Sequence, residues 1–286
     1  MAKGRELKGR LRSVENTRKI TRTMEMVAAS KLKRAADRVS SARPYAAALR
    51  EVMSSLYSPD LAERFPLLRQ PEREARAAVV LITSNRGLAG AFNANLIREA
   101  RSLLERLDAA GTDTDLYIVG RKGAGYFRYV GRSIANVITD VSDRPSSEDA
   151  SRLVNHLMDS FVAGGIDALY VVSAKFNSAL STPPTSEQVL PVEPPEATSS
   201  RHDYLLFPDA ETILDELLPA YVRNQMYKAL VETAAGEQGA RRTAMKSATD
   251  NATEMIGLLR RDYNRSRQAQ ITQEIAEIVG GAAALE

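Results

Sequence analysis

The chain has 286 residues, 44% of them hydrophobic and 26% charged, which is typical of a soluble protein with room for one large domain or two modest ones. It contains no cysteine, which excludes disulfides, thiolate nucleophiles and cysteine-based metal sites, and its two histidines offer little for a histidine-based one. The formal charge of +3 is uneven, because residues 1–43 hold 13 Lys and Arg against four acidic residues, a net charge of +9.

The beginning of the chain is basic and has no apolar core. No apolar run reaches the roughly 18–20 residues that span a bilayer, and MAKGRELKGRLRSVEN lacks the pattern of a secretory signal. We therefore expect the chain to begin at its mature start, in a cytoplasm of bacterial type. The concentrated positive charge leaves nucleic acid, an acidic protein surface and anionic lipid open as partners.

A heptad repeat follows from Leu7, and twelve of its fifteen a and d positions up to Leu56 are apolar. A period of 3.5 residues sustained over about seven heptads is a coiled-coil pattern. It predicts a coiled-coil helix over residues 1–58, with a local kink at Pro44 and an end near Ser58-Pro59. The seam of this helix is expected to include Leu7, Leu11, Val14, Leu32, Val39 and Leu49.

Three consecutive seam positions are polar, namely Arg18, Thr21 and Glu25. Over the same stretch, an apolar stripe lies on a different face of the helix and consists of Ile20, Met24 and Val27. Either the coiled coil is locally staggered here, or this face of the helix meets a second partner. The spacing favours the second partner.

The middle of the chain changes period. Four apolar or alternating runs, AAVVLITS, TDLYIVG, SIANVITDV and DALYVVSAKF, predict strands, and helical stretches at residues 91–107, 123–129 and 147–163 separate them. Strands that alternate with helices indicate a mostly parallel open sheet, so residues 75–208 are expected to form an α/β domain. EQVLPVE and DYLLFPD predict late strands near an edge.

The last segment, residues 209–286, has a second helical period. Apolar positions recur at Met245, Ala248, Ala252, Met255 or Ile256, Leu259 and Tyr263, followed by the stripe Ile271, Ile275, Ile278, Ala282 and Leu285. About 65 helical residues would make a rod of roughly 100 Å. Because a rod of that length cannot be covered by a domain of this size, part of it should project and meet a partner.

A glycine-containing turn, ITSNRGLAGAFNAN at residues 82–95, raises the question of a phosphate site. A P-loop needs GxxxxGK[ST], and a dinucleotide loop needs GxGxxG with an acidic residue about 20 positions later. The chain has neither, which favours a turn that packs against the sheet and leaves a nucleotide-dependent enzyme as the weaker alternative. His156 and His202 have no partner motif, so no catalytic or metal-binding residue is expected.

A coiled-coil adaptor or nucleic-acid binder is the other alternative. A DNA-binding basic region normally leads into a parallel zipper. Here the heptads run through the basic stretch itself, and no aromatic residue interrupts that stretch before Tyr45. Pattern alone therefore favours a long coiled-coil shaft with an inserted Rossmann-like α/β domain.

Several motifs resemble one family, the gamma subunit of rotary F-type ATP synthases. They are VENTRKITRTMEMVAASKLKRA, SARPYAAALREV, NRGLAGAFN, VGRKG, YVRNQMYKALVETAAGEQGARRTAMKSATDNA and YNRSRQAQITQEIAEIVGGAAA. They occur in the family's order and cover both ends and the middle of the chain. The resemblance implies an antiparallel left-handed coiled coil of the terminal helices with an α/β foot domain.

The resemblance also implies a role. The tip of the shaft would enter the hexamer of alpha and beta subunits, and the foot would lie beside the epsilon subunit and the c-subunit ring. Rotation would couple ion flow to the catalytic sites of the hexamer, while the chain itself would bind no nucleotide, cofactor or metal and contact the membrane only indirectly. The complex would lie at the cytoplasmic face of the bacterial inner membrane.

The family's contact positions transfer residue by residue. Met24, Arg267, Gln268, Thr272 and Glu274 match positions that meet the moving lower regions of the beta subunits. The stripe from Ile271 to Leu285 matches the tip inside the apolar collar, and Arg86, Gly87, Gly90 and Asn93 match the structural turn.

The chain also departs from its relatives. Ala89 and Ala91 stand where many relatives have Cys and Gly, and the inserted cysteine pair of the plastid form is missing, which rules out thiol switching. Pro219 predicts that Ala210–Leu218 is split from the long C-terminal helix.

Overall fold

A computed structural model describes residues 2–56, 64–141, 143–192 and 209–283. By its contacts the chain divides into two compact units. One contains the chain up to Ala28 and from Arg242 onward, and the other contains Ala29–Arg241. Two helices, α1 (Ala2–Leu56) and α6 (Ala210–Ala283), take part in both units, and each is continuous through the division.

The larger unit is built on a five-stranded sheet in the order β3-β2-β1-β4-β5. Its strands are β1 (Arg76–Ile82), β2 (Asp113–Val119), β3 (Asn136–Ile138), β4 (Ala168–Ala174) and β5 (Pro184–Leu190). The first four are parallel, and β5 pairs antiparallel with β4 at an edge. The mostly parallel sheet and the late edge strand are therefore confirmed. The strand expected in DYLLFPD spans residues 203–209, of which 203–208 lie outside the described residues.

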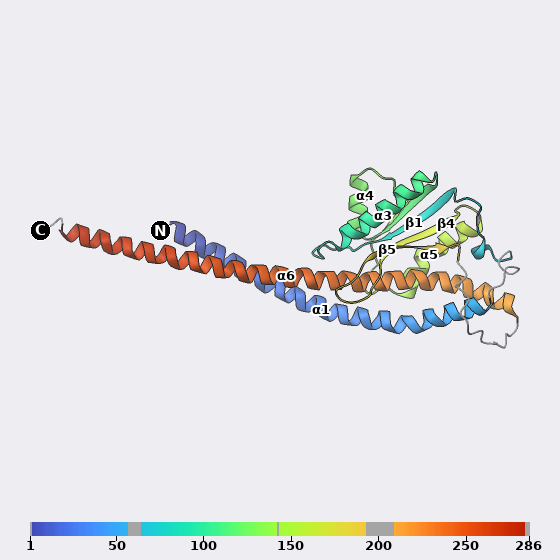
Figure 1. The fold of residues 1–286 in the computed structure, drawn as a ribbon, viewed down its shortest axis with the longest axis horizontal. Helices are drawn as coiled ribbons and strands as arrows, with labels where there is room; N and C mark the ends of the chain where they lie inside the picture. The colour runs from blue at the N-terminus through green and yellow to red at the C-terminus, as the bar shows by residue number, and fades with distance from the viewer. Residues whose placement is uncertain (1, 57–63, 142, 193–208, 284–286) are drawn as a thin grey trace. The chain divides into compact units, whose positions relative to one another are not determined.

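Helices cover both faces of this sheet (Figure 1). On one face lie α3 (Phe92–Ala109) and α4 (Arg121–Tyr129), and on the other lie α5 (Ser147–Val162) and the first part of α6. A short 3-10 helix, η1 (Pro66–Leu68), packs with the second group. The three helices expected between the strands are thus confirmed.

Alternation along β1 explains why both faces are covered. Ala78, Val80 and Ile82 belong to the core shared with α5 and α6. Ala77, Val79 and Leu81 belong to the core shared with α3 and α4. Because successive side chains of a strand point to opposite faces, an unbroken apolar run requires a helical layer on each side.

The expected split of the C-terminal helix at Pro219 is wrong, because α6 continues through this residue. A proline in a helix interior costs about 3 kcal/mol through a lost hydrogen bond and a steric clash. Leu214, Leu218 and Val222 are fully buried in the same core cluster on both sides of the proline. Their packing stabilises the helical conformation against that cost. Pro44 also lies inside an unbroken α1, and the local kink expected there stays a prediction.

The heptad positions of α1 differ in exposure between the two units. In the larger unit, Leu32, Val39 and Leu49 are buried. In the smaller unit, Leu7, Leu11 and Val14 are half-buried. No described a or d position between Leu7 and Met53 is exposed, which is the pattern expected of one helix face held against a partner.

A close approach of two backbones fixes the turn between β2 and α4. Gly120 has φ +98, a conformation that glycine adopts without steric cost. A Cβ added there would collide with the carbonyl oxygen of Thr83, the residue that follows β1. The hydroxyl of Thr83 also accepts a hydrogen bond from the amide of Gly123 at 3.0 Å. These contacts lock the start of α4 onto the end of β1.

We predict that Leu32→Asp lowers the free energy of unfolding of the isolated subunit by about 2–5 kcal/mol, because it places a carboxylate at a buried seam position. The measurement is urea unfolding followed by circular dichroism. Lys33→Asp adds the same side chain at an exposed neighbour and should change stability by less than about 0.5 kcal/mol. Equal unfolding curves for the two variants would refute the heptad register.

We predict that Gly120→Ala destabilises the subunit by about 1–3 kcal/mol, because alanine is strained at φ +98 and its Cβ meets the Thr83 carbonyl. Gly125→Ala lies inside α4, where its Cβ meets nothing within 4 Å, and should be neutral or stabilising by up to about 1 kcal/mol. Thermal unfolding of both variants decides the point. A Gly120→Ala variant as stable as the control would show that the close approach is not a constraint.

Candidate functional site

The glycine turn connects β1 to α3 and is held by side chains of its own sequence. The amide of Ser84 donates to Oδ1 of Asn93 at 3.0 Å, and the Ser84 hydroxyl donates to the carbonyl of Arg86 at 2.5 Å. Gly90 has φ +57, and Leu88 has φ +63, which is uncommon for a residue with a side chain. Arg86 is exposed and Gly87 is half-buried.

Three amides at the starts of α3 and α4, where a phosphate would be held, already have partners. At the start of α4, the amide of Arg121 donates to Oδ1 of Asn85 at 3.1 Å and the amide of Lys122 donates to the carbonyl of Ser84 at 3.1 Å. At the start of α3, the amide of Phe92 donates to the carbonyl of Ala89. A phosphate loop needs such amides free to point at the ligand, so the geometry favours a turn that serves the fold.

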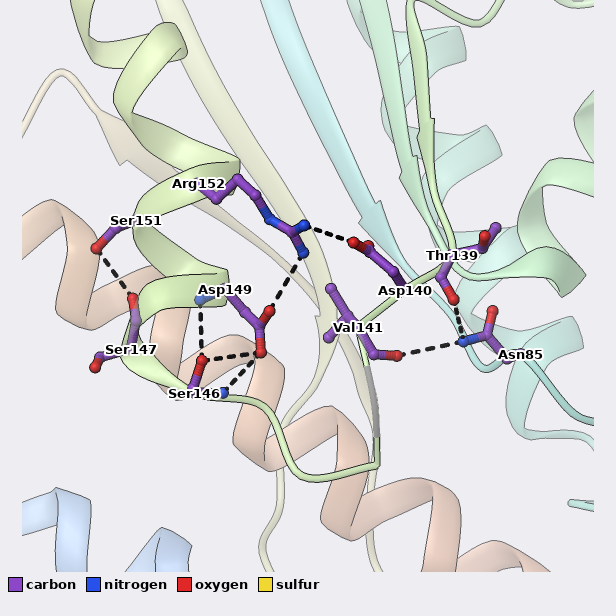
Figure 2. Close-up of polar contacts among 9 residues, drawn as sticks. All are labelled: Asn85, Thr139, Asp140, Val141, Ser146, Ser147, Asp149, Ser151 and Arg152. Atoms are coloured by element: carbon purple, nitrogen blue, oxygen red, sulfur yellow. Dashed lines mark hydrogen bonds and ion pairs between the residues drawn. The ribbon is translucent and has the colours of Figure 1, made fainter.

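The neighbouring connection, from β3 to α5, is also closed by internal hydrogen bonds (Figure 2). Nδ2 of Asn85 donates to the carbonyls of Thr139 and Val141 at 2.9 and 3.3 Å. Ser146 and Asp149 form a capping box at the start of α5. The turn after β1 and the segment after β3 are therefore joined into one network.

An ion pair in the same view joins α5 to the segment after β3 (Figure 2). Arg152 donates to Asp140 at 2.5 Å and to Asp149 at 3.3 Å. The hydrogen bond from Arg152 holds the pKa of Asp140 below its usual value, so this carboxylate stays charged at neutral pH. The pair is exposed, which is typical of a structural contact and not of a catalytic one.

No constellation for catalysis or metal binding is evident among the described residues. Within them, no three His, Asp or Glu side chains gather as a metal site requires. His156 packs its ring against Tyr117 with centroids 5.5 Å apart, and burial raises the pKa of that tyrosine. His202 lies outside the described residues. None of the described helices has the length and hydropathy needed to cross a bilayer.

In the smaller unit, polar pairs fix how α1 and α6 meet. The hydroxyl oxygens of Thr21 and Thr249 lie 2.8 Å apart, and Arg260 donates to Glu15 at 2.8 Å. Pairing a later residue of α1 with an earlier residue of α6 makes the two helices antiparallel. Thr21 is only 8% exposed, so this polar seam position has a buried partner on the facing helix.

The residues expected to meet beta subunits lie in this unit, and the hydrogen bonds of Thr272 and Glu274 stay within α6, the second one coming from Gln270 at 3.1 Å. Arg267, Gln268, Thr272 and Glu274 are exposed, while Met24 is half-buried. Arg267 has no ion-pair partner within the described ranges. The Thr272 hydroxyl donates only to the carbonyl of Gln268 in its own helix, at 2.9 Å. The structure thus places these side chains on the surface of the unit and leaves their partners to be proposed.

The tip stripe is equally exposed. Ile271, Ile275 and Ile278 are 48%, 56% and 72% exposed. The side chains of Ala282 and Leu285 lie outside the described residues. Besides Ile20 and Val27 of the expected second face, Met26, Leu258 and Val279 are exposed apolar residues that the sequence interpretation did not single out. Of the alternatives Met255 and Ile256, the structure buries Ile256 and exposes Met255.

Comparisons with known proteins agree over the whole chain. A sequence model of the family described as ATP synthase matches residues 3–285. The ATP synthase gamma chain of Gemmatimonas aurantiaca is 64% identical over 289 residues, covering 100% of both chains. The ATP synthase gamma chain of Frankia casuarinae is 45% identical and covers 98% of this chain and 97% of its own.

Solved structures share the fold. The central stalk and c-ring structure of Tetrahymena thermophila mitochondrial ATP synthase contains a chain with a TM-score of 0.63 and 25% identity, matched over 80% of this chain and 99% of its own. A chain of the Euglena gracilis mitochondrial ATP synthase gives a TM-score of 0.70 at 20% identity, over 99% and 95%. From the match over residues 3–285 and the full-length identity to curated gamma chains, the chain belongs to the gamma chain family of ATP synthases.

Proposed function

We propose that the chain is the central-stalk rotor subunit of an F-type ATP synthase, which couples ion-driven rotation of the c-subunit ring to conformational change at the catalytic sites of the alpha and beta subunits. The exposed apolar stripe near the end of α6 carries this proposal. Ile271, Ile275 and Ile278 recur at helical spacing on one side of a 74-residue helix and remain about half exposed or more. A contiguous apolar stripe on a soluble protein indicates a surface that a partner covers.

The subunit would itself be non-catalytic. The amides of Arg121, Lys122 and Phe92, at the starts of the two helices beside the glycine turn, have internal partners, and His156 packs against Tyr117. Calorimetry with ATP on the isolated subunit tests this part directly. Heat of binding with a dissociation constant below about 10 µM would bring back the nucleotide-dependent enzyme.

The proposed partners follow from the two kinds of surface. The apolar stripe fits a mostly apolar collar of the alpha and beta hexamer, and the polar residues Arg267, Gln268, Thr272 and Glu274 fit the moving regions of the beta subunits below it. The α/β domain would bind the epsilon subunit and the c-ring at the cytoplasmic face of the bacterial inner membrane. Co-purification with alpha and beta subunits in fixed stoichiometry is the first test.

We predict that the double variant Ile275→Asp, Ile278→Asp weakens assembly with alpha and beta subunits at least tenfold. Each isoleucine would contribute about 1 kcal/mol or more by burial in the collar, and a buried carboxylate would add a larger penalty. The measurement is recovery of the complex in a pull-down titration. Gln273→Asp adds charge to the same turn at an exposed polar position and should assemble normally. Equal assembly of both variants would contradict an apolar collar at this stripe.

We predict that Met24→Lys impairs coupling more than folding. Met24 is off the heptad seam and half-buried, so the isolated subunit should unfold at nearly the same temperature. A new ammonium near charged groups of a beta subunit would add a strong contact in some rotary states only and raise the barrier to rotation. The measurement is ion pumping per ATP hydrolysed by the assembled complex.

Met26→Lys is the matched control, because Met26 is 59% exposed on a different side of α1. It should pump nearly as well as the unmodified complex. The prediction is wrong if Met24→Lys pumps as efficiently as the unmodified complex. It is also wrong if both variants lose pumping equally, because the Met24 face would then have no special role.

A further inference from the structure

One stretch of α6 in the larger unit is largely enclosed by the rest of that unit. No side chain from Asn224 to Arg241 is exposed, although the helix is exposed again at Arg242. A helix enclosed all round is usually apolar throughout. This one instead carries buried Glu232, Thr233 and Arg241. Buried polar groups require partners, and their partners show what this stretch of helix is attached to.

The first attachment is to the end of strand β4. The amide of Ala174, its last residue, donates to the hydroxyl of Thr233 at 3.1 Å. The amide of Phe176, two residues further on, donates to Oε2 of Glu232 at 2.9 Å. Two adjacent side chains of α6 thus bind two backbone amides, one in the last residue of β4 and one just after it. Hydrogen bonds to backbone fix position more strictly than contacts between two flexible side chains.

The second attachment is to the glycine turn after β1. Nη2 of Arg241 donates to the carbonyl of Gly87 at 3.2 Å and to Oε1 of Glu237 at 2.5 Å. The side chains of Arg241 and Glu237 are only 10% and 13% exposed. Removal from water makes such a charged pair directional and intolerant of displacement. The glycine turn after β1, for which no ligand-binding role was found, is therefore a point of attachment for α6.

The third attachment is steric. A Cβ added to Gly236 would lie 3.1 Å from the ring of Phe92, 3.3 Å from Thr182 and 3.4 Å from Ala174. A Cβ added to Gly239 would lie 3.0 Å from the carbonyl oxygen of Ala179. Glycine weakens a helix interior relative to alanine. Its presence at these two positions is explained by the close approach of the domain to the helix.

Viewed down the helix axis, these contacts cover about half of the circumference of α6. At about 100° per residue, Glu232, Gly236 and Gly239 share one side of α6, whereas Arg241 lies on the opposite side and Thr233 between them. Rotation of the helix about its own axis would break contacts on both sides at once. By comparison, the polar ties of α1 to the same domain are more exposed, such as the ion pair of Lys31 and Asp143, with side chains 33% and 37% exposed.

We propose that residues 232–241 of α6 form a torsional clamp, the segment in which the α/β domain holds the shaft helix against rotation, so that torque applied to the domain enters the shaft there. The proposal rests on the rotor function proposed above and adds to it the residues that transmit the load. From Arg241 the helix continues without a break to Ala283. Glu232, Thr233 and Arg241 are therefore positioning residues for rotation and not contacts to another subunit.

The test uses the full complex in vesicles and the same complex without its membrane sector. Gly236→Ala and Gly239→Ala should wedge the domain from the helix, and Gly257→Ala is the matched control, because its Cβ meets nothing within 4 Å. We expect the first two to keep ATP hydrolysis without load within about twofold and to lose ion pumping per ATP at least fivefold. The control should lose neither.

A second set of variants removes the hydrogen bonds without adding volume. Glu232→Met with Thr233→Val removes both acceptors, whereas Glu232→Gln with Thr233→Ser keeps an acceptor at each position. We expect the first double variant to lose pumping under load and the second double variant to retain most of it. This set tests the clamp even if Gly236→Ala fails to fold, which thermal unfolding of the isolated subunit would show.

The torsional stiffness of the shaft distinguishes a clamp from a purely structural role, because a loss of stability alone would not change it. With the hexamer fixed to a surface and a rod attached to the α/β domain, the angular fluctuation of the rod should widen at least twofold in the acceptor-removing pair. Fluctuation and pumping equal to those of the control in every variant would overturn the clamp. Failure of the unmodified chain to assemble or rotate would instead overturn the rotor function itself.

Discussion

The enclosed stretch of α6 around residues 224–241 belongs to the core of the α/β domain and does not simply lie on its surface. Leu214, Leu218 and Val222 reach this core from earlier turns of the helix and are essentially inaccessible to solvent. A sheet needs an apolar layer on each face, and α6 supplies a large part of one. The domain and the helix therefore stabilise each other.

The polar groups within that stretch follow from the same constraint. A helix that only packed would be stable with apolar side chains alone, and burying Glu232 or Arg241 without partners would cost several kcal/mol. Each has a partner in the domain, at Phe176 and at Gly87. Such a network adds less to stability than to uniqueness of position, because sliding or turning the helix leaves buried groups unpaired.

The smaller unit is built on a different principle. Its two helices share a narrow seam in which Thr21 faces Thr249, while Ile20 and Val27 on α1 and Ile275 on α6 remain exposed. A two-helix seam buries too little to enclose both helices. The exposed apolar residues are therefore available to a partner, whereas the domain core in the larger unit is complete by itself.

The three sequence ranges 1–58, 75–208 and 209–286 remain a prediction about domains, because the contacts divide the chain inside α1 and α6 instead of at their ends. The sequence predicted the heptad period, the alternation of β1 and the order of strands and helices, because each is a local repeat of side-chain character. Family membership was readable as well, because its motifs span both ends and the middle.

Only the tertiary structure decided the outcome at Pro219 and the role of the glycine turn. The cost of a proline is local, but Leu218 and Val222 outweigh it through contacts with residues distant in sequence. Likewise, a motif comparison can show that the glycine turn has no phosphate-binding lysine. It cannot show that the carbonyl of Gly87 accepts a hydrogen bond from Arg241, 154 positions away. Periodicity predicts which face of a helix or strand is buried. It does not predict which residues of other elements cover that face, because those contacts depend on the tertiary fold of the whole chain.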